Sequence, residues 1–175
     1  FLKLLPAFLI VISICNEFSY RTHKQNIIDG LSRREFFLSK LAFATFLALL
    51  SATLIGTLGF ILGFANSEIQ TFESIMANIE FLAVHFYQLI LFFLFAMLVA
   101  IIFRRSGLTI VGLIFYTLFI EPIAATIASR NNDFYAYFFP VESIARLIEF
   151  PFTRYLLLET QNSVSMITVG VSALW

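Results

Sequence analysis

Few side chains in this sequence could carry out catalysis or bind a metal ion. The two histidines, His23 and His85, fall on opposite sides of a predicted membrane, and so do the two aspartates, Asp29 and Asp133. Because a metal site needs several such ligands close together, an intramembrane zinc or aspartyl hydrolase is excluded. Cys15 is the single cysteine, which excludes an internal disulfide and a cysteine-based metal cluster.

Residues that bind nucleotides or nucleic acids are also missing. The sequence has no Gly-Lys pair, and therefore no P-loop that could hold ATP. Its net charge is 0, which gives no indication of nucleic acid as a partner. We therefore expect no enzymatic activity, no metal and no cofactor in this chain, so that any energy source is another polypeptide.

Glu121 is the only acid within a predicted membrane span. A charge at the bilayer centre costs about 2.5–3.5 kcal/mol, so this side chain should face protein or water. Pro122 follows it and leaves a backbone carbonyl one turn earlier without its usual donor. Two interpretations stay open. Glu121 is a polar contact at a translocation path or dimer interface, or it lies near the outer surface and stabilises the kink at Pro122.

The elements that would position these residues are helices in a membrane. The chain has 175 residues, of which 60% are hydrophobic and only 13% are charged, and its mean hydropathy is +0.92. Soluble domains carry about a quarter charged residues, so we predict an all-α integral membrane protein, a polytopic helical bundle.

Three complete spans are predicted, at 41–64, 81–103 and 107–128. Residues 4–15 and 164–175 have the composition of partial spans, as expected for a fragment of a longer protein. Small residues in the first complete span, namely Ala52, Gly56, Gly59 and Gly63, are expected to allow close helix packing.

Lysine and arginine predict the orientation of these spans. They are concentrated in the connection at 16–40 and in the short turn at 104–106, whereas the connection at 65–80 has three glutamates and no basic residue. The segment at 129–163 has fewer basic residues than the first connection. The positive-inside rule therefore places 16–40 and 104–106 in the cytoplasm.

The first connection contains a predicted helix break. Residues 17–29 form a short helix that stops at Asp29-Gly30, with Gly30 suited to the left-handed position after a helix. Ser32 and Glu35 then form a capping box, in which each side chain accepts the backbone N–H of the other residue. The sequence thus predicts a separate cytoplasmic helix at the base of a span.

The basic residues after the break have two interpretations. Lys40 is expected to reach the lipid headgroups, and Arg33 and Arg34 could likewise do no more than anchor the span against lipid phosphates. Anchoring alone does not explain the preceding helix, whose exposed surface needs a partner.

The stretch EFSYRTHKQNIIDGLSRREFFLSKL, residues 17–41, resembles the signature of type-2 ABC exporter permeases. In that family a Glu opens the segment, a Thr follows five residues later, and a Ser-Arg pair and a Lys close it. The matching positions here are Glu17, Thr22, Ser32-Arg33 and Lys40, without a gap over the 24 residues 17–40. Two positions differ from the family pattern, since Arg21 stands where Gly is common and Gly30 where Pro is common. Either Gly or Pro ends a helix.

This resemblance implies a six-span permease subunit that forms a translocation path as a homo- or heterodimer. A cytoplasmic ABC ATPase, which holds ATP and Mg, would bind each half and drive it through a coupling helix at 17–30. The residues that would couple to the ATPase are Glu17, Arg21, Thr22, Lys24, Gln25, Ile27, Ile28, Gly30, Ser32 and Arg33. The resemblance also implies a multi-pass protein of the bacterial inner (plasma) membrane.

Residues 140–160 are predicted to form an outer helical hairpin. Pro140 is acceptable in a first helical turn, and Val141, Ile144 and Ile148 follow at helical spacing. Pro151 interrupts this helix and a second one starts after it. A re-entrant hairpin that dips into the outer leaflet and a pair of helices lying flat on the surface both fit this pattern. The resemblance favours the re-entrant hairpin.

A second class of function fits the same sequence. The chain could be a non-transporting membrane scaffold whose cytoplasmic helix recruits a partner without ATP-driven motion. A passive channel is disfavoured, because the spans hold too few polar residues to line a continuous wet pore. The apolar spans would suit a lipid, a drug or a lipid-linked polymer as substrate, and would suit lipid contact alone equally well.

Overall fold

The structure of the chain is all helical wherever it is described. The computed structural model describes residues 3–20, 22, 25, 28, 30, 32–66, 79–130, 139–145, 147 and 166–173. The helices are α1 (Leu4–Ser19), α3 (Arg33–Asn66), α5 (Ile79–Phe103), α6 (Ser106–Phe115), the π-helix η1 (Tyr116–Ile120), α7 (Glu121–Ser129), α8 (Pro140–Ala145) and α10 (Met166–Ser172). No strand occurs among the described residues, in agreement with the predicted fold class.

Within the described part of the chain, three helical segments are long and apolar enough to cross a membrane. They are Arg34–Ala65, Ile79–Phe103 and Ser106–Ser129, with mean hydropathies of 2.1, 2.6 and 2.0. Each of the three predicted spans lies within one of these segments. A helix satisfies its backbone hydrogen bonds internally, which is what the hydrocarbon core of a bilayer requires. The length and composition of these segments are those of a helical membrane protein.

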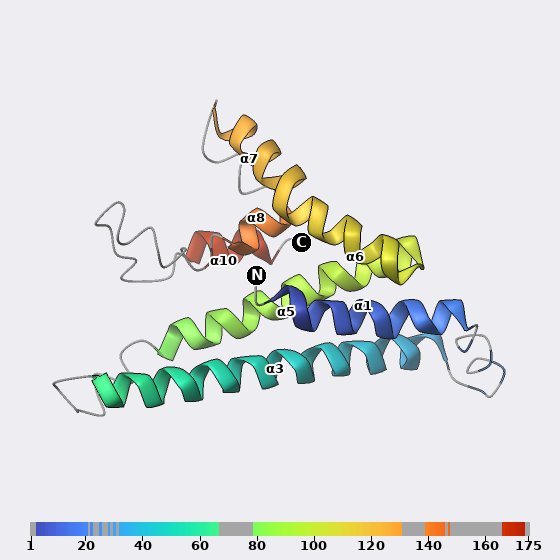
Figure 1. Ribbon diagram of the computed structural model, residues 1–175, viewed down its shortest axis with the longest axis horizontal. Helices are drawn as coiled ribbons and strands as arrows, with labels where there is room; N and C mark the ends of the chain where they lie inside the picture. Colours follow the sequence, from blue (N-terminus) through green and yellow to red (C-terminus); the bar gives the residue numbers. More distant parts are fainter. Residues whose placement is uncertain are drawn as a thin grey trace.

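Helix α5 lies at the centre of the bundle. It packs against α1, α3, α6 and α8, and Figure 1 shows α1, α3 and α5 side by side with α6 and α7 continuing away from them. Its buried side chains form much of the core, and they are Leu89, Phe92, Phe93, Ala96, Met97 and Ala100. Alanines at 96 and 100 let neighbouring helices approach closely, while the two phenylalanines fill the space between α5 and its neighbours.

The C-terminal end of α1, the start of α3 and the connection between α5 and α6 lie at one end of the bundle (Figure 1). We call this the basic end, because it carries Arg34, Lys40, Arg104 and Arg105. Arg104 has a φ of 55°, and its guanidinium lies 5.6 Å from the centroid of the Phe18 ring on α1. A cation–π contact of this kind holds the short connection against α1.

The third span changes its winding just before Glu121. Helix α6 passes into the five-residue π-helix Tyr116–Ile120, and α7 follows at Glu121. Pro122 has no backbone N–H, and its ring clashes with the carbonyl four residues earlier, so a regular α-helix cannot continue through it. The wider π turn accommodates the proline within one continuous apolar segment.

Only some of the small residues on α3 lie close to a neighbouring helix. The small residues of this stripe are Ala52, Gly56, Gly59 and Gly63. A methyl group added at Gly56 would lie 3.0 Å from Leu82 Cδ2 on α5, so the two helices approach closely at this point. Ala52, one turn earlier, is also buried. Gly59 and Gly63 have no atom within 4 Å of such a methyl group in the described part of the chain. The predicted packing role therefore applies to the first half of the stripe.

Candidate functional site

Polar side chains are buried at both ends of the bundle, and the first group lies at the basic end. Lys40 of α3 forms an ion pair with Glu17 of α1, and its Nζ also donates a hydrogen bond to Ser13 Oγ at 3.0 Å. The side chains of Lys40 and Glu17 are only 13% and 24% exposed. A partly buried ion pair supported by a hydroxyl group is a strong, directional contact. It fixes the start of α3 to the end of α1.

The position of Glu17 differs from the sequence prediction. Helix α1 continues past Cys15 to Ser19, so Glu17 belongs to its C-terminal part and lies one turn after Ser13 on the same face. This spacing allows Lys40 to contact both residues. Lys40 was expected to reach lipid headgroups, whereas it turns inward to α1. The first and the last position of the 17–40 segment therefore meet in space.

Two local features of the predicted helix break are confirmed, namely the conformation of Gly30 and the capping box at Ser32 and Glu35. Gly30 has a φ of +99°, in the left-handed region that L-residues rarely adopt. The backbone N–H of Ser32 donates to Glu35 Oε2 at 2.7 Å, and the backbone N–H of Glu35 donates to Ser32 Oγ at 3.2 Å. These reciprocal bonds are the predicted capping box. They satisfy donors at the start of α3 that have no acceptor within the helix.

The other residues predicted to couple to an ATPase are described only in part. Thr22 Oγ1 donates a long hydrogen bond of 3.4 Å to the carbonyl of Glu17. Gln25 and Ile28 are exposed, and Ile28 keeps 83% of its surface accessible. The following lie outside the described residues: Arg21, Lys24, Ile27 and the side chain of Arg33.

The second group of buried polar side chains lies at the opposite end, around Glu121. This residue is 1% exposed, and its Oε1 accepts the backbone N–H of Glu142 at 2.7 Å. Glu142 is in the first turn of α8, where backbone N–H groups have no acceptor within the helix. The carboxylate of Glu121 therefore caps α8 from another helix, and its negative charge is favourable at that helix end.

Helix α8 has a further polar anchor on α5. Gln88 Nε2 donates to the backbone carbonyl of Ile144 at 2.9 Å. One side chain thus holds the start of α8 and another holds its last turn. A helix of six residues is too short to be stable alone, so these contacts and the burial of Val141, Ser143 and Ile144 position it.

A cavity of about 230 Å³, lined by both charged and apolar residues, adjoins this contact. Its walls come from the start of α1, from the η1–α7 junction and from α8, and they include Lys3, Thr117, Glu121 and Glu142. Lys3 is not recognisable from the sequence as part of this cavity. It lies 118 positions before Glu121, and no local pattern links the two residues. This set of charged groups at the opposite end is the main feature that the sequence did not reveal.

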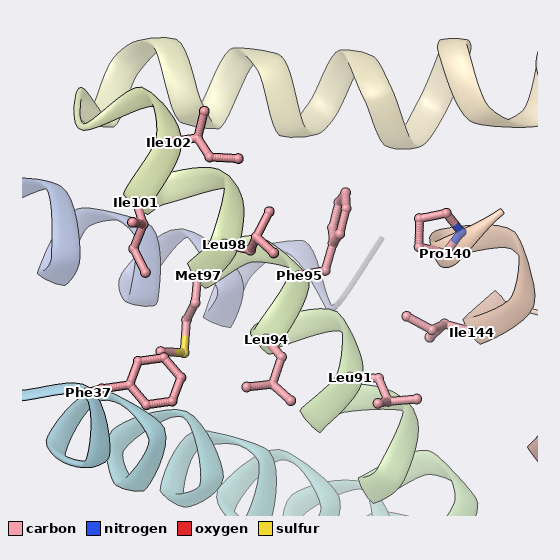
Figure 2. A pocket seen from close by; sticks show the side chains of 10 residues that line it. All are labelled: Phe37, Leu91, Leu94, Phe95, Met97, Leu98, Ile101, Ile102, Pro140 and Ile144. Carbon is pink, nitrogen blue, oxygen red and sulfur yellow. The ribbon is translucent and has the colours of Figure 1, made fainter. Parts of the chain in front are cut away.

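A larger cavity of about 500 Å³ runs beside α5 and is lined by apolar side chains (Figure 2). Phe37 of α3 lies at one part of it, and Pro140 and Ile144 of α8 lie at another. The remaining wall belongs to α5 and consists of Leu91, Leu94, Phe95, Met97, Leu98, Ile101 and Ile102. Such a lining offers no hydrogen bond and no charge, so it suits only hydrocarbon.

The described residues offer little for bond-making chemistry. Nowhere among them do three His, Cys, Asp or Glu side chains come together as a metal site would require. No family model, no curated protein and no solved structure matches this chain. The resemblance to exporter permeases therefore remains a prediction that is based on residues 17–41.

Proposed function

We propose that this chain is the permease subunit of an ATP-driven ABC exporter, moved by a separate cytoplasmic ATPase. The observation that supports this most is the ion pair between Glu17 and Lys40, the two residues that begin and end the signature-like segment. Their contact brings the two ends of the segment together in space. Between Tyr20 and Ser32, the described residues are Thr22, Gln25, Ile28 and Gly30. All four are exposed, as a docking element requires.

The link from this segment to a span is stiff. The capping box at Ser32 and Glu35 starts α3 without a frayed turn, and α3 then continues as one helix to Asn66. A displacement of the residues before Gly30 would be transmitted by α3 to its membrane-spanning part. Ile28, which is 83% exposed, offers an apolar contact for a partner on the same segment. The basic residues at this end favour the cytoplasmic side.

The opposite end supports a re-entrant outer segment. Ser106 to Glu121 spans about 22 Å at 1.5 Å per residue, whereas the hydrocarbon core is about 30 Å thick. With the connection before Ser106 at one surface, Glu121 lies below the other surface, and α8 is bonded to Glu121 at that depth. A helix lying flat on the membrane would not reach it. We therefore include a re-entrant outer helix in the proposed permease.

The test is co-purification with an ATPase. The chain is expressed together with an ABC ATPase encoded beside it, and the complex is isolated through a tag on the membrane subunit. We expect the ATPase to co-purify in a stable ratio. A variant that combines Arg21→Glu, Lys24→Glu and Ile27→Asp should lose it, because charge and apolar contact are both reversed on the proposed coupling helix.

A matched control keeps the charge reversal on the same side of the membrane. Arg105→Glu changes an exposed residue of the neighbouring connection and should leave ATPase binding intact. If the triple variant binds the ATPase as well as the wild type does, the coupling assignment is wrong. A partner that binds the segment but hydrolyses no ATP would instead support the non-transporting scaffold.

A further inference from the structure

The apolar cavity beside α5 is closed on one side and open on another. Met97 and Ile144 form part of its inner wall, and both side chains are only 2% exposed. Phe37, Leu98 and Ile102 line the same cavity but are exposed. Because α5 is long and apolar enough to cross a membrane, the hydrocarbon chains of a bilayer have direct access to this open side.

The cavity extends along α5 over the depth of one membrane leaflet. Figure 2 shows Phe37 at one end of it and Pro140 and Ile144 at the other. The lining residues of α5 run from Leu91 to Ile102, a distance of about 16 Å at 1.5 Å per residue. The hydrocarbon core of a bilayer is about 30 Å thick, so one leaflet contributes about 15 Å. The cavity therefore has the length of one lipid acyl chain.

The volume and the lining agree with this length. The volume of about 500 Å³ is within the range of about 300–1,000 Å³ that is usual for ligand sites. The side chains of the lining are aliphatic and aromatic, apart from the thioether of Met97. A polar group placed there would lose its hydrogen bonds to water without replacement, whereas a hydrocarbon chain loses none.

The end of the cavity at Phe37 lies at the basic end of the bundle. Arg34 comes one turn before Phe37 on the same face of α3, and its side chain is exposed. Arg104 and Arg105 follow Ile102 within three residues and are exposed as well. Basic residues at a membrane surface attract anionic lipid headgroups. An apolar cavity with positive charge at its surface end matches a lipid that has an acyl chain below an anionic headgroup.

We propose that this cavity binds one acyl chain of an anionic phospholipid from the leaflet at the basic end, with the lipid phosphate at Arg34. A guanidinium group can donate two parallel hydrogen bonds to the oxygens of a phosphate. The acyl chain lies between the start of α3, the outer face of α5 and α8, which are the three elements that line the cavity.

The inference goes beyond the proposed export function and does not depend on it. Binding at this cavity needs neither the ATPase nor nucleotide, so it can be measured on the membrane chain alone. Loss of ATPase binding would leave this proposal unaffected. Absence of lipid binding would likewise leave the coupling segment untouched.

The experiment compares two phospholipids that share their acyl chains. Dioleoyl phosphatidylglycerol is anionic, whereas dioleoyl phosphatidylcholine is zwitterionic. Each is added to the purified full chain in detergent, and the bound lipid is measured by native mass spectrometry. We expect the wild type to bind the anionic lipid about tenfold more tightly. Arg34→Gln should lower this preference about fivefold, which is the contribution of one basic residue near an anionic headgroup.

A second pair of variants tests the cavity itself. Leu98→Trp places a larger side chain at the open side of the cavity and should weaken the binding of both lipids about tenfold, because the acyl chain loses its access and part of its contact area. Leu54→Trp is the matched control on α3, since Leu54 and Leu98 are both 56% exposed and Leu54 is not part of the lining. It should bind both lipids as the wild type does.

Arg130→Gln is the control for charge, at an exposed arginine that follows α7. It should keep the full preference for the anionic lipid. Equal binding of the two lipids by the wild type would overturn the proposal, and so would an unchanged preference in Arg34→Gln. Equal lipid binding by Leu98→Trp and Leu54→Trp would overturn it as well, since the cavity would then be covered by protein, such as a second copy of the chain.

Discussion

The two ends of the bundle use a buried carboxylate in different ways. At the basic end Glu17 meets a charged partner, Lys40, and the contact joins two long helices. At the opposite end Glu121 meets a backbone N–H and holds the start of a helix of six residues. The first arrangement makes a rigid joint. The second positions a helix that is too short to be stable alone.

This difference between the two carboxylates agrees with different functions of the two ends. A connection that transmits movement between helices has to be rigid. The ion pair between the end of α1 and the start of α3 resists the separation of these two helices. A contact that positions a short helix needs an acceptor for a backbone N–H at its first turn, and Glu121 Oε1 provides it. Predictions that disturb each end separately therefore test whether the two carboxylates have different roles.

The largest effect is expected at the basic end. Lys40→Met removes the positive partner and leaves the carboxylate of Glu17 in a partly buried place, which should lower the free energy of unfolding by about 3 kcal/mol. Unfolding by SDS titration in mixed micelles measures this. The double variant Glu17→Gln, Lys40→Met should recover much of the loss. If the double variant is no more stable than Lys40→Met, the ion pair does not account for the effect.

A smaller effect is expected at the opposite end. Glu121→Ala removes the acceptor for the Glu142 N–H and should cost about 2 kcal/mol, whereas Glu121→Gln keeps an acceptor oxygen and should cost about 1 kcal/mol. Because Glu121 positions α8, the alanine variant should also expose Ser143, which is fully buried. Maleimide labelling of a Ser143→Cys reporter measures this. Equal labelling with and without Glu121→Ala would contradict the capping role.

The capping box should give an effect of about 1 kcal/mol. Ser32→Ala removes the oxygen that accepts the Glu35 N–H, so the start of α3 loses part of its cap. Ser39→Ala is the matched control, since Ser39 is exposed on the same helix and bonds only the carbonyl of Phe36. The control should stay within about 0.5 kcal/mol of the wild type. A control as destabilising as Ser32→Ala would show that the cap has no special role.

The smallest effect is expected at Arg104. Arg104→Gly relieves the backbone strain at a φ of 55° but loses the contact with the Phe18 ring, and these changes are of opposite sign. The net change in the free energy of unfolding should be within about 1 kcal/mol. Phe18→Leu keeps the backbone of Arg104 unchanged but removes the cation–π contact and part of the packing of Phe18 against the core, so it should only destabilise. The guanidinium also donates a long hydrogen bond of 3.4 Å from Nε to the carbonyl of Ile101. A loss above about 2 kcal/mol in Arg104→Gly would contradict the balance of these opposite effects.

The sequence allowed correct predictions where the signals are local. The three spans follow from long apolar stretches, and the capping box and the left-handed Gly30 follow from a few adjacent residues. Each of these features depends on backbone hydrogen bonds or on conformational preferences within one or two turns. Such preferences act in any surroundings, so a single sequence is enough to predict them.

The partners of the buried charges could not be predicted in this way. Lys40 and Glu17 are 23 positions apart, and Glu121 and Glu142 are 21 apart. Whether such residues meet depends on how α1, α3, α7 and α8 pack, and no pattern within one helix specifies that. Opposite charges at the two ends of the 17–40 segment were a usable signal for the first pair. For Lys3 and Glu121, no comparable signal exists.

The central claim is that the 17–40 segment passes ATP-driven movement from an ATPase to the spans. Nitroxide labels at the exposed positions Thr22 and Thr126 would report this as a distance measured by double electron–electron resonance in the complex with the ATPase. We expect ATP with Mg to change the distance in the wild type, and Lys40→Met to abolish the change while the ATPase stays bound. The same distance with and without ATP, or the same change in Lys40→Met, would contradict the claim.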